Sequence, residues 1–407
     1  MLRAFALVLL ATGTTVVAAD SKVIRVTVEA GRFARRDSPI RILVNDEAIG
    51  ELAPIALRLT SDNDPATTAV VQADRSEGKV RLTWITPKPI PAGASAHYTI
   101  DTTRPIGNPG PWYLDRSPIA ETLRHDDKVV FRYNAAPVTS PNYGPIQHRN
   151  AYIHPAYSPS GALVTGDFSK FHPHHRGIFF AYAKAKSGDR ALDFWNIQTD
   201  KGKIVHERLD GESVGPVTAR FSTRHRWVDK AGAVVLRERW DVEAFAIPGS
   251  PYWLFDLTST QQAEGMPFEV LPYRYGGIAY RGAEPFVKGP IDVLTAEGRH
   301  RVDGNLKPTR WVDLTGPIAD GSPTYAGAMI ADHPSNPNHP TVARIHPTTL
   351  PFFSFVPASD KQLTIAVNSP TVFRYRIMIH DGRPDADRDE RTWRDFSEPP
   401  KVMVDGR

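Results

Sequence analysis

The 407-residue sequence contains no cysteine, which excludes disulfide bonds, thiolate nucleophiles and cysteine-ligated metals. Its apolar runs are shorter than the roughly 18 residues that a membrane-spanning helix needs, so we expect a soluble mature chain without membrane contact. Lys and Arg number 49 against 45 Asp and Glu, and these charges are scattered along the chain. The charge pattern therefore gives no support to a nucleic-acid partner.

Several sequence signatures are also missing. The chain has no H-E-x-x-H zinc motif, no P-loop and no G-x-G-x-x-G dinucleotide fingerprint, so we expect no nucleotide cofactor. No segment shows helical periodicity over three turns, and no repeat of fixed period occurs. The 36 prolines and 29 glycines are instead spread throughout, which is typical of many short strands joined by turns.

The N-terminus is typical of an export signal. Arg3 supplies a positive charge, residues 4–10 and 15–17 are apolar, and Ala18 and Ala19 offer small residues for cleavage. We predict a signal peptide at residues 1–19 and a periplasmic or secreted protein. The alternative is a membrane anchor, but the apolar run is short and interrupted.

Residues 20–103 alternate apolar and polar side chains, for example at 24–28 and 80–84, as strands with one buried face do. We predict a small immunoglobulin-like β-sandwich there. Residues 104–111 contain three prolines and two glycines and are predicted to be a linker.

Residues 112–407 contain further short strand patterns, of which 234–245 and 373–379 are the clearest. We predict that this second domain is a large two-sheet β-sandwich and that it carries the functional site. The fold class is therefore predicted to be all-β. The sequence gives no indication of the oligomeric state.

The densest group of chemically active side chains lies at residues 171–177, just before an apolar strand pattern. It contains His172, His174, His175 and Arg176, which are our candidate catalytic residues. His172 and His174 would point the same way on extended backbone and could share a divalent metal, since zinc, copper and nickel all accept imidazole. Without a metal they could act as acid, base or hydrogen-bond donor. The alternative is a purely structural loop, in which the histidines cap backbone groups and pack against Tyr or Trp side chains.

A second group contains arginines near glycines. Arg274 and Arg281 flank a glycine-broken strand pattern, and a guanidinium suits a carboxylate, a sulfate or vicinal hydroxyls. His333 begins a proline-rich loop at 332–340, and His154 precedes Pro155. We predict that His154, Arg274, Arg281 and His333 bind substrate. The alternatives are ordinary ion pairs and a surface turn.

Hydrolysis of a glycosidic bond needs an acid and a base, commonly two carboxyl groups. The candidates are Glu207, Glu238, Glu269, Asp193 and Asp332, and their spacing does not show which converge. Aromatic residues stand near the polar segments, as in the walls of many sugar sites.

Four of these motifs, in order, resemble the exported bacterial family labelled "methane oxygenase PmoA". They are 153–161, 172–177, 274–282 and 332–340, and the resemblance runs from Trp112 to Gly382. It implies an exported β-sandwich protein, often found alongside sugar-degrading enzymes. The matching positions are His154, His172, His174, His175, Arg176, Arg274, Arg281 and His333.

Three functions are consistent with these observations. The first is an exported carbohydrate-active enzyme that hydrolyses, eliminates or epimerises a glycan or smaller substrate in a His/Arg-lined pocket. The second, suggested by the family label, is a metal-dependent oxidoreductase with its metal on His172 and His174, copper being one candidate metal. The third is a glycan-binding protein without catalysis.

Overall fold

The computed structural model describes residues 23–45, 49, 55–107, 110–140 and 142–405. The predicted signal peptide at 1–19 lies outside these residues. The chain is almost entirely β-structure, which confirms the predicted all-β sandwich class. It forms two compact units, one from Met1–Pro109, Gly215–Val217 and Pro400–Arg407, the other from Gly110–Val214 and Thr218–Pro399.

The first unit contains one antiparallel sheet in the order β2-β5-β4-β3-β6-β1-β28. Alternate residues such as Ile24, Val26 and Val28 enter its core beside Leu57 and Trp84, as the period of two predicts. The strands are β1 (Val23–Glu29), β2 (Pro39–Asn45), β3 (Ile55–Ser61), β4 (Thr68–Ser76), β5 (Lys79–Ile85), β6 (Ser95–Ile106) and β28 (Lys401–Asp405).

The C-terminal strand belongs to this first unit rather than to the second. β28 pairs with β1, with Val402 opposite Val28, so the second unit stops before the predicted end at residue 407. The predicted linker also starts too early, because Arg104 and Pro105 still belong to β6. A proline is tolerated there because it lies near a strand end, beside a register shift.

The second unit has two large sheets and one small sheet. The nine-stranded sheet runs β21 (Lys307–Pro308), β24 (Val342–Ile345), β25 (Phe352–Val356), β19 (Gly276–Arg281), β11 (Ile178–Tyr182), β10 (Tyr152–Ala156), β9 (Lys128–Asn134), β8 (Ala120–His125), β7 (Trp112–Ser117). The eight-stranded sheet runs β14 (Lys203–Val214), β15 (Thr218–Val228), β16 (Val234–Phe245), β17 (Tyr252–Ala263), β27 (Thr371–Asp381), β23 (Tyr325–Asp332), β22 (Trp311–Pro317), β20 (Asp292–Thr295). The small sheet contains β13 (Arg190–Leu192), β12 (Ala185–Ser187), β18 (Phe268–Val270) and β26 (Leu363–Ile365).

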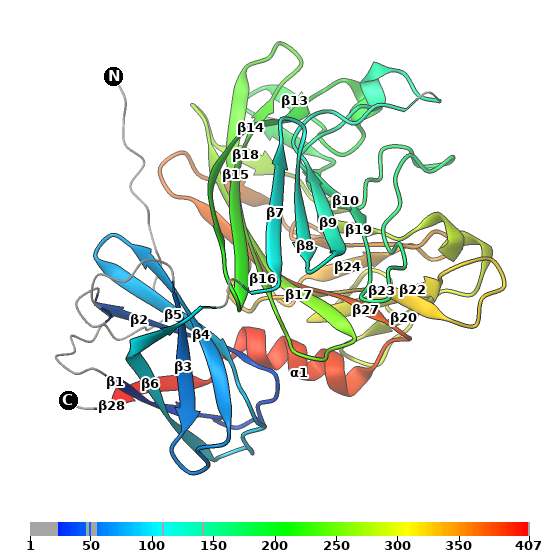
Figure 1. Ribbon diagram of the computed structural model, residues 1–407. Coiled ribbons are helices and arrows are strands. Elements are labelled where there is room, and N and C mark those ends of the chain that lie inside the picture. The colour runs from blue at the N-terminus through cyan, green and yellow to red at the C-terminus, as the bar shows by residue number, and fades with distance from the viewer. Residues whose placement is uncertain (1–22, 46–48, 50–54, 108–109, 141, 406–407) are drawn as a thin grey trace. The chain divides into compact units, whose positions relative to one another are not determined.

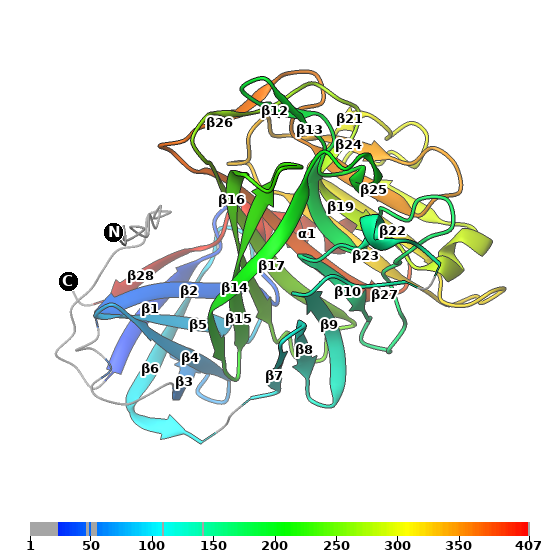
Figure 2. The same ribbon diagram turned by 90° about the horizontal axis from the view of Figure 1, so that it is seen from above.

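The two large sheets pack face to face, as predicted for a two-sheet sandwich (Figures 1 and 2). Aromatic rings meet between them: Phe180 of β11 lies 5.3 Å from Phe373 of β27, measured between ring centroids. Phe355 of β25 lies 6.2 Å from Tyr375 of β27. Interdigitating side chains of this size form a dry core between the sheets.

The other face of the nine-stranded sheet carries the candidate site. Since Phe180 points into the core, its neighbour Phe179 must point outward. Phe179 pairs across the ladder with Ala279, and two residues further along β19 is Arg281, opposite Phe352. Phe179, Arg281 and Phe352 therefore share this outer face. All residues of β11, β19 and β25 are buried, so this face is covered as well.

One helix contradicts the expectation of no helical segment. Helix α1 spans Ala386–Ser397 and begins at Asp385, whose carboxylate accepts the backbone N–H groups of Asp387 and Arg388. Its buried residues are mostly polar, with Trp393 as the only large apolar one, so a hydrophobic pattern could not reveal it. Asp385 at the N-cap position is the sequence feature that could have predicted the start of this helix.

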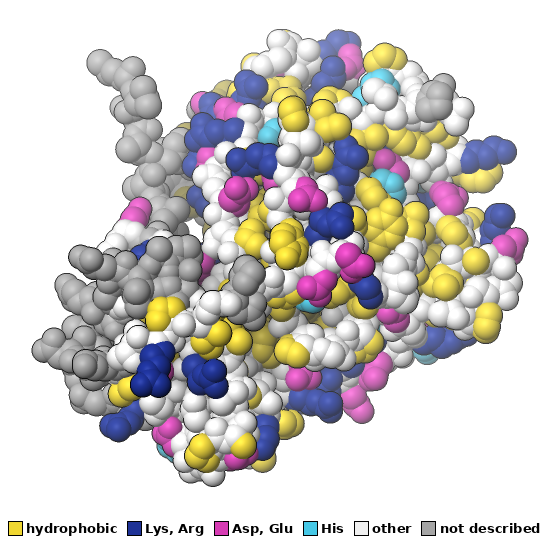
Figure 3. All heavy atoms as spheres, in the orientation of Figure 1, with side chains coloured by type: hydrophobic (Ala, Val, Ile, Leu, Met, Phe, Trp, Pro, Cys, Tyr) yellow, Lys and Arg dark blue, Asp and Glu magenta, His cyan; other side chains and the backbone are white. Residues whose placement is uncertain are grey.

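Among the residues that the structure describes, no helix is both long and apolar enough to cross a membrane. On the face drawn in Figure 3, Lys and Arg side chains are interspersed with Asp and Glu. This agrees with the scattered charges of the sequence.

The pairing of β28 with β1 predicts a difference between two neighbouring substitutions. Val402 packs against the core of the first unit, whereas Met403 is exposed. Val402→Asp should lower the free energy of unfolding of that unit by about 1–3 kcal/mol, because it places a carboxylate against apolar side chains. Met403→Asp, the control, should change it by no more than about 0.5 kcal/mol. Urea unfolding monitored by circular dichroism measures both, and equal effects would contradict the packing of β28.

Candidate functional site

The His/Arg motif lies on a loop, residues 166–177, that closes onto β19. The backbone N–H of Gly166 donates to the carbonyl of Arg281 at 2.9 Å, and the N–H of Gly177 donates to the carbonyl of Gly166 at 2.8 Å. Gly177 has a φ of 43°, and a Cβ there would lie 2.1 Å from the carbonyl oxygen of Ile153. Only glycine fits this position, so the loop is fixed where it enters β11.

His175 attaches the loop to the outward face of the sheet. Its ring stacks on Phe352 with centroids 4.4 Å apart and meets Trp195 edge-on at 5.7 Å. Trp195 in turn lies 4.8 Å from Phe179. His175 is 5% exposed, so this imidazole forms the inner wall of the site.

Four imidazoles gather at this point, and we call them the imidazole cluster. His175 lies 4.5 Å from His174 and 5.0 Å from His172, between ring centroids. His346, one residue after β24, lies 5.9 Å from His172. The sequence alone does not indicate His346 as a site residue, because nothing local connects residue 346 with residue 172.

The environment favours the neutral form of all four rings. Burial, reinforced by the charges of His172 and Arg149, lowers the pKa of His174 to about 3. Burial and the nearby Arg344 lower the pKa of His346 to about 4. The pKa values of His172 and His175 are also lowered, chiefly by burial. Neutral imidazoles can accept protons, which protonated ones cannot.

Arg281 is a charged group close to the cluster, since, in addition to burial, its charge contributes to lowering the pKa values of His172, His175 and His346. Its side chain is fully buried, and its Nη2 donates to Ser169 Oγ at 2.8 Å and to Glu284 at 3.0 Å. Among the described residues, its Nε and Nη1 atoms find no hydrogen-bond partner, and neither do the Nδ1 atoms of His172 and His175. Buried donors without acceptors are costly, so this corner of the site favours an anionic or oxygen-rich ligand.

Arg176 and His154 lie deeper and support the loop. The Arg176 guanidinium is fully buried, donates to Asp167 at 2.7 Å and covers the ring of Phe168 at 3.4 Å. His154 Nδ1 lies 2.9 Å from the hydroxyl of Thr165. For Arg176 the ion-pair alternative therefore describes the structure better than a direct catalytic role.

Arg274 lies at the outer margin of the site. It is exposed, and its guanidinium lies 5.9 Å from the ring centroid of Tyr275. Tyr275 is 5.4 Å from Trp195, which links this margin to the imidazole cluster. The pKa of nearby Arg344 is lowered by burial and by the charge of Arg274. Two cations in proximity are a further reason to expect an anionic ligand.

His333 does not join the cluster. It follows β23 of the other large sheet, and its ring packs edge-on against Phe396 of α1 at 4.9 Å. Its Nδ1 lies 2.8 Å from the hydroxyl of Ser335. The structure therefore brings together His172, His174, His175 and Arg281, and places His333 elsewhere.

The predicted metal site lacks a ligand set. Within the described ranges, no group of three or more His, Asp or Glu side chains is arranged to hold a metal ion. His172 and His174 are close, with ring centroids 5.8 Å apart, but a stable site needs a third protein ligand.

The five candidate carboxylates lie on different elements, and each already has partners. Asp193 holds its own turn by accepting the N–H groups of Trp195 and Asn196. Asp332 accepts from Asn336, His339 and Thr341. Glu269 pairs with Lys186 at 2.8 Å, Glu207 lies 3.8 Å from Arg226, and Glu238 is in the core. This arrangement gives no support to a two-carboxylate hydrolase.

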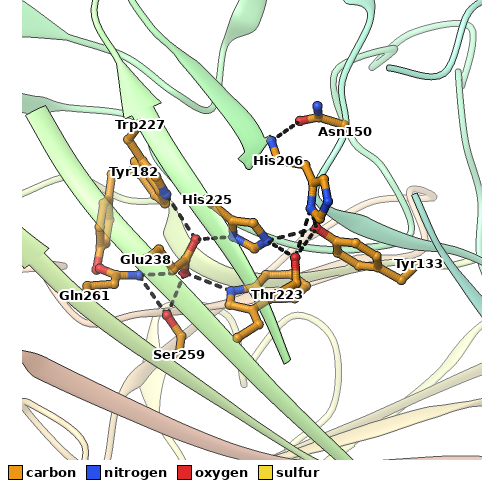
Figure 4. A network of polar contacts seen from close by, with 11 residues as sticks. Tyr133, Asn150, Tyr182, His206, Thr223, His225, Trp227, Glu238, Ser259 and Gln261 are labelled. Carbon is orange, nitrogen blue, oxygen red and sulfur yellow. Dashed lines mark hydrogen bonds and ion pairs between the residues drawn. The ribbon is translucent and has the colours of Figure 1, made fainter. Parts of the chain in front are cut away.

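Figure 4 shows a second polar network, centred on Glu238, between the two large sheets. The buried carboxylate accepts from His225 at 3.0 Å, Trp227 at 3.0 Å, Trp240 at 2.8 Å, Ser259 at 2.6 Å and Gln261 at 3.0 Å. Burial alone would raise the pKa of Glu238, but His225 and the other donors hold it below its ordinary value. Glu238 is a charged residue at an inward-facing position of β16, where the alternation pattern would place an apolar residue. Its side chain occupies this position because it belongs to the core network.

The network continues from His225 toward a partly exposed histidine. His225 Nε2 lies 2.9 Å from the hydroxyl of Tyr133, which is also 3.0 Å from Thr223 Oγ1 and 3.0 Å from His206 Nδ1. The buried donors and acceptors of the Glu238 network all have hydrogen-bond partners, whereas, in the described part of the chain, two nitrogens of Arg281 do not. We therefore assign it to the stability of the sandwich.

Residues 211–215 match the G-x-S-x-G pattern of a serine nucleophile elbow. The structure places Ser213 near the end of β14, paired with Arg220 of β15 in an antiparallel hairpin. A nucleophile elbow needs a strand followed by a sharp turn into a helix. Ser213 is therefore not in the setting of a nucleophilic serine.

Residues 120–394 match a protein family described as "Family of unknown function (DUF6807)". No curated protein matches the chain. Among solved structures, the chain is similar to a galactose mutarotase-like protein from Lactobacillus casei ATCC 334, with 10% sequence identity and a TM-score of 0.27, over 66% of this chain and 100% of that one. A similarity of this size establishes neither a common fold nor a common activity.

The Glu238 network predicts a large loss of stability in Glu238→Gln. The amide would present two N–H donors to groups that are themselves donors, which leaves buried hydrogen bonds unmade. We expect the free energy of unfolding to fall by about 3 kcal/mol. Glu207→Gln, on an exposed position of β14, is the matched control and should stay within about 0.5 kcal/mol. Similar losses in the two variants would mean that the network contributes little.

The imidazole cluster predicts that stability decreases in acid. In the unfolded chain these imidazoles bind protons near pH 6.5, whereas folded His346 binds one only near pH 4. The unfolded state therefore takes up more protons as the pH falls between these values. Urea unfolding at several pH values should give a shallower decline for His346→Gln than for the wild type, with parallel curves above pH 6.5. Identical slopes below pH 6.5 would argue against a buried, neutral His346.

Proposed function

This chain belongs to the family of unknown function DUF6807, and we propose that it is a carbohydrate-active enzyme for an acidic sugar. The reaction class is removal of the proton next to a carboxylate, as in elimination or epimerisation of a uronate unit. The observation that carries the proposal is the buried Arg281, with two nitrogens that lack a partner among the described residues, close to a cluster of neutral imidazoles. We also propose that the protein acts outside the cytoplasm, on the basis of residues 1–19.

Arg281 would bind the carboxylate of the substrate. Its Nε and Nη1 atoms lack acceptors within the described ranges, and a carboxylate oxygen is the acceptor that a buried guanidinium binds most strongly. During proton removal, negative charge builds up on that carboxylate, and a fixed cation in a site shielded from water stabilises it. The substrate carboxylate would accept from Nε and Nη1, in addition to the Glu284 carboxylate that already accepts from Nη2.

His172 is our choice for the general base. It is less buried than His175, its Nδ1 has no hydrogen-bond partner among the residues that the structure describes, and its lowered pKa keeps the ring unprotonated at neutral pH. The imidazole takes the proton from the carbon beside the carboxylate. In elimination, the electron pair of that C–H bond forms a double bond as the C–O bond to the neighbouring sugar breaks, and the leaving oxygen takes up the proton that His172 has removed. In epimerisation, water supplies a proton to the same carbon from the opposite face, and His172 releases its own proton to solvent.

Three other side chains assist without touching the reacting carbon. The rings of His174 and His346 lie 5.8 and 5.9 Å from that of His172, between centroids, and limit its orientation. Phe171 is 78% exposed beside His172, and an exposed aromatic ring there is suited to stack on a sugar. The cluster at strand ends, held by a glycine-fixed loop, resembles the rigid setting that catalysis requires.

Solvent deuterium exchange tests the step that elimination and epimerisation share. Purified protein is incubated in D2O with uronate-containing oligosaccharides, and deuterium in substrate and product is measured by mass spectrometry, with absorbance reporting any conjugated double bond. We expect exchange by the wild type and a loss of about 100-fold or more in His172→Gln, the usual size of a general-base contribution. Arg281→Lys should also be strongly impaired because it loses donors to the carboxylate.

The control for this experiment is His97→Gln, a histidine of the first unit that binds the hydroxyl of Thr27. It should leave exchange at the wild-type rate. If His172→Gln folds, as judged by circular dichroism, and retains wild-type exchange, His172 is not the base. Saturable binding without exchange or product would identify a glycan-binding protein instead.

A further inference from the structure

A groove outside the imidazole cluster remains unassigned. It has a volume of about 480 Å³, within the range typical of small-molecule sites. It is formed by β12 and β13, by residues next to these strands, and by Lys201 and the residue after β18. Its lining includes Lys184, Asp189, Leu192, Asp193, Lys201 and Leu271.

The groove is polar in a way that suits sugar hydroxyls. Lys184 and Lys201 are exposed, and the charge of Lys201 acts on Asp193, which also lines the groove. Asp189 is also exposed and lines the groove. Ammonium donors and carboxylate acceptors together can bind a hydroxyl-rich ligand from both sides, whereas an apolar ligand would leave them unsatisfied.

A path of aromatic side chains leads from this groove to the imidazole cluster. A smaller hollow shares Lys184 and Leu271 with the groove and is also lined by Tyr273 and Tyr275. The two tyrosine rings lie 4.7 Å apart, edge to face. Tyr275 lies 5.4 Å from Trp195, which meets His175 at 5.7 Å. The second connection is Asn196, which donates to the Tyr275 hydroxyl at 3.3 Å and to Asp193 at 2.8 Å.

We propose that this groove is a distal subsite for the sugar units next to the one held at the imidazole cluster, so that the ligand is an acidic oligosaccharide rather than a monosaccharide. The inference rests on the proposed function for the identity of the reacting unit. Tyr273 and Tyr275 offer partly exposed rings on which the C–H face of a sugar stacks, and Lys184 and Lys201 bind hydroxyl or carboxylate oxygens beyond them.

Chain-length dependence tests the subsite. kcat/KM is measured with a series of uronate oligosaccharides from disaccharide to hexasaccharide. For the wild type, kcat/KM should rise with length and then level off once the groove is filled. Tyr273→Ala and Lys201→Ser should each remove about a three- to tenfold part of this rise, the size of one stacking or charged contact. The value for the shortest active substrate should not change.

Lys128→Ser is the matched control, since Lys128 is an exposed lysine at the start of β9, remote in the sheet from β19 and β25. It should keep the full rise with length. If the wild type shows no rise, or if both groove variants keep it, the groove is not a subsite.

Binding measured by calorimetry separates this inference from the proposed reaction. If no oligosaccharide reacts but the hexasaccharide binds wild type more tightly than Tyr273→Ala and Lys201→Ser, the subsite stands and the reaction is wrong. If it binds all three proteins equally, or none of them, the subsite is overturned as well.

Discussion

The candidate site depends on the fact that the central strands of the nine-stranded sheet are buried on both faces. One face packs against the second sheet, while the other carries Phe179, Arg281 and Phe352 and must be covered by something else. The loop at 166–177 provides that cover by stacking His175 on Phe352. The contact that shields apolar surface from water is thus the one that brings imidazoles to a buried arginine. Stability and site chemistry have a common origin here.

Two buried polar groups of this unit behave differently. Glu238 is surrounded by five donors, so its charge is fully satisfied inside the sandwich. Arg281 has Ser169 and one oxygen of the exposed Glu284, and two of its nitrogens remain without an acceptor in the described part of the chain. A network in which every buried polar group has a hydrogen-bond partner stabilises a core. A buried guanidinium with N–H groups that lack acceptors, beside unprotonated imidazoles, is instead typical of a site that binds a ligand. This contrast is why we place function at the outer face of the sheet.

The same comparison explains the outcome for the arginines selected from the sequence. All of Arg176, Arg274 and Arg281 stand near glycines, and no local pattern distinguishes them. In the structure Arg176 pairs with the nearly buried Asp167 and leaves one nitrogen without a partner among the described residues, and Arg274 is exposed at the margin. Arg281 pairs with the exposed Glu284 and leaves two nitrogens without an acceptor among the described residues. Their different environments come from cross-strand neighbours and from the path of the loop, which are contacts between residues distant in the chain.

The sequence by itself determined the all-β class, the strands with clear alternation such as β16, and the position of His172–His175 on a loop before a buried strand. These features follow from the alternation of apolar and polar side chains and from turn residues, both of which are visible within a short stretch of sequence. Only the tertiary structure decided that His346 joins the cluster, that His333 lies beside α1, and that β28 completes the first unit. It also decided that a helix with a polar buried face forms at Ala386–Ser397. The physical reason is that strand alternation shows which residues of one strand share a face, whereas the pairing of distant strands decides which faces meet.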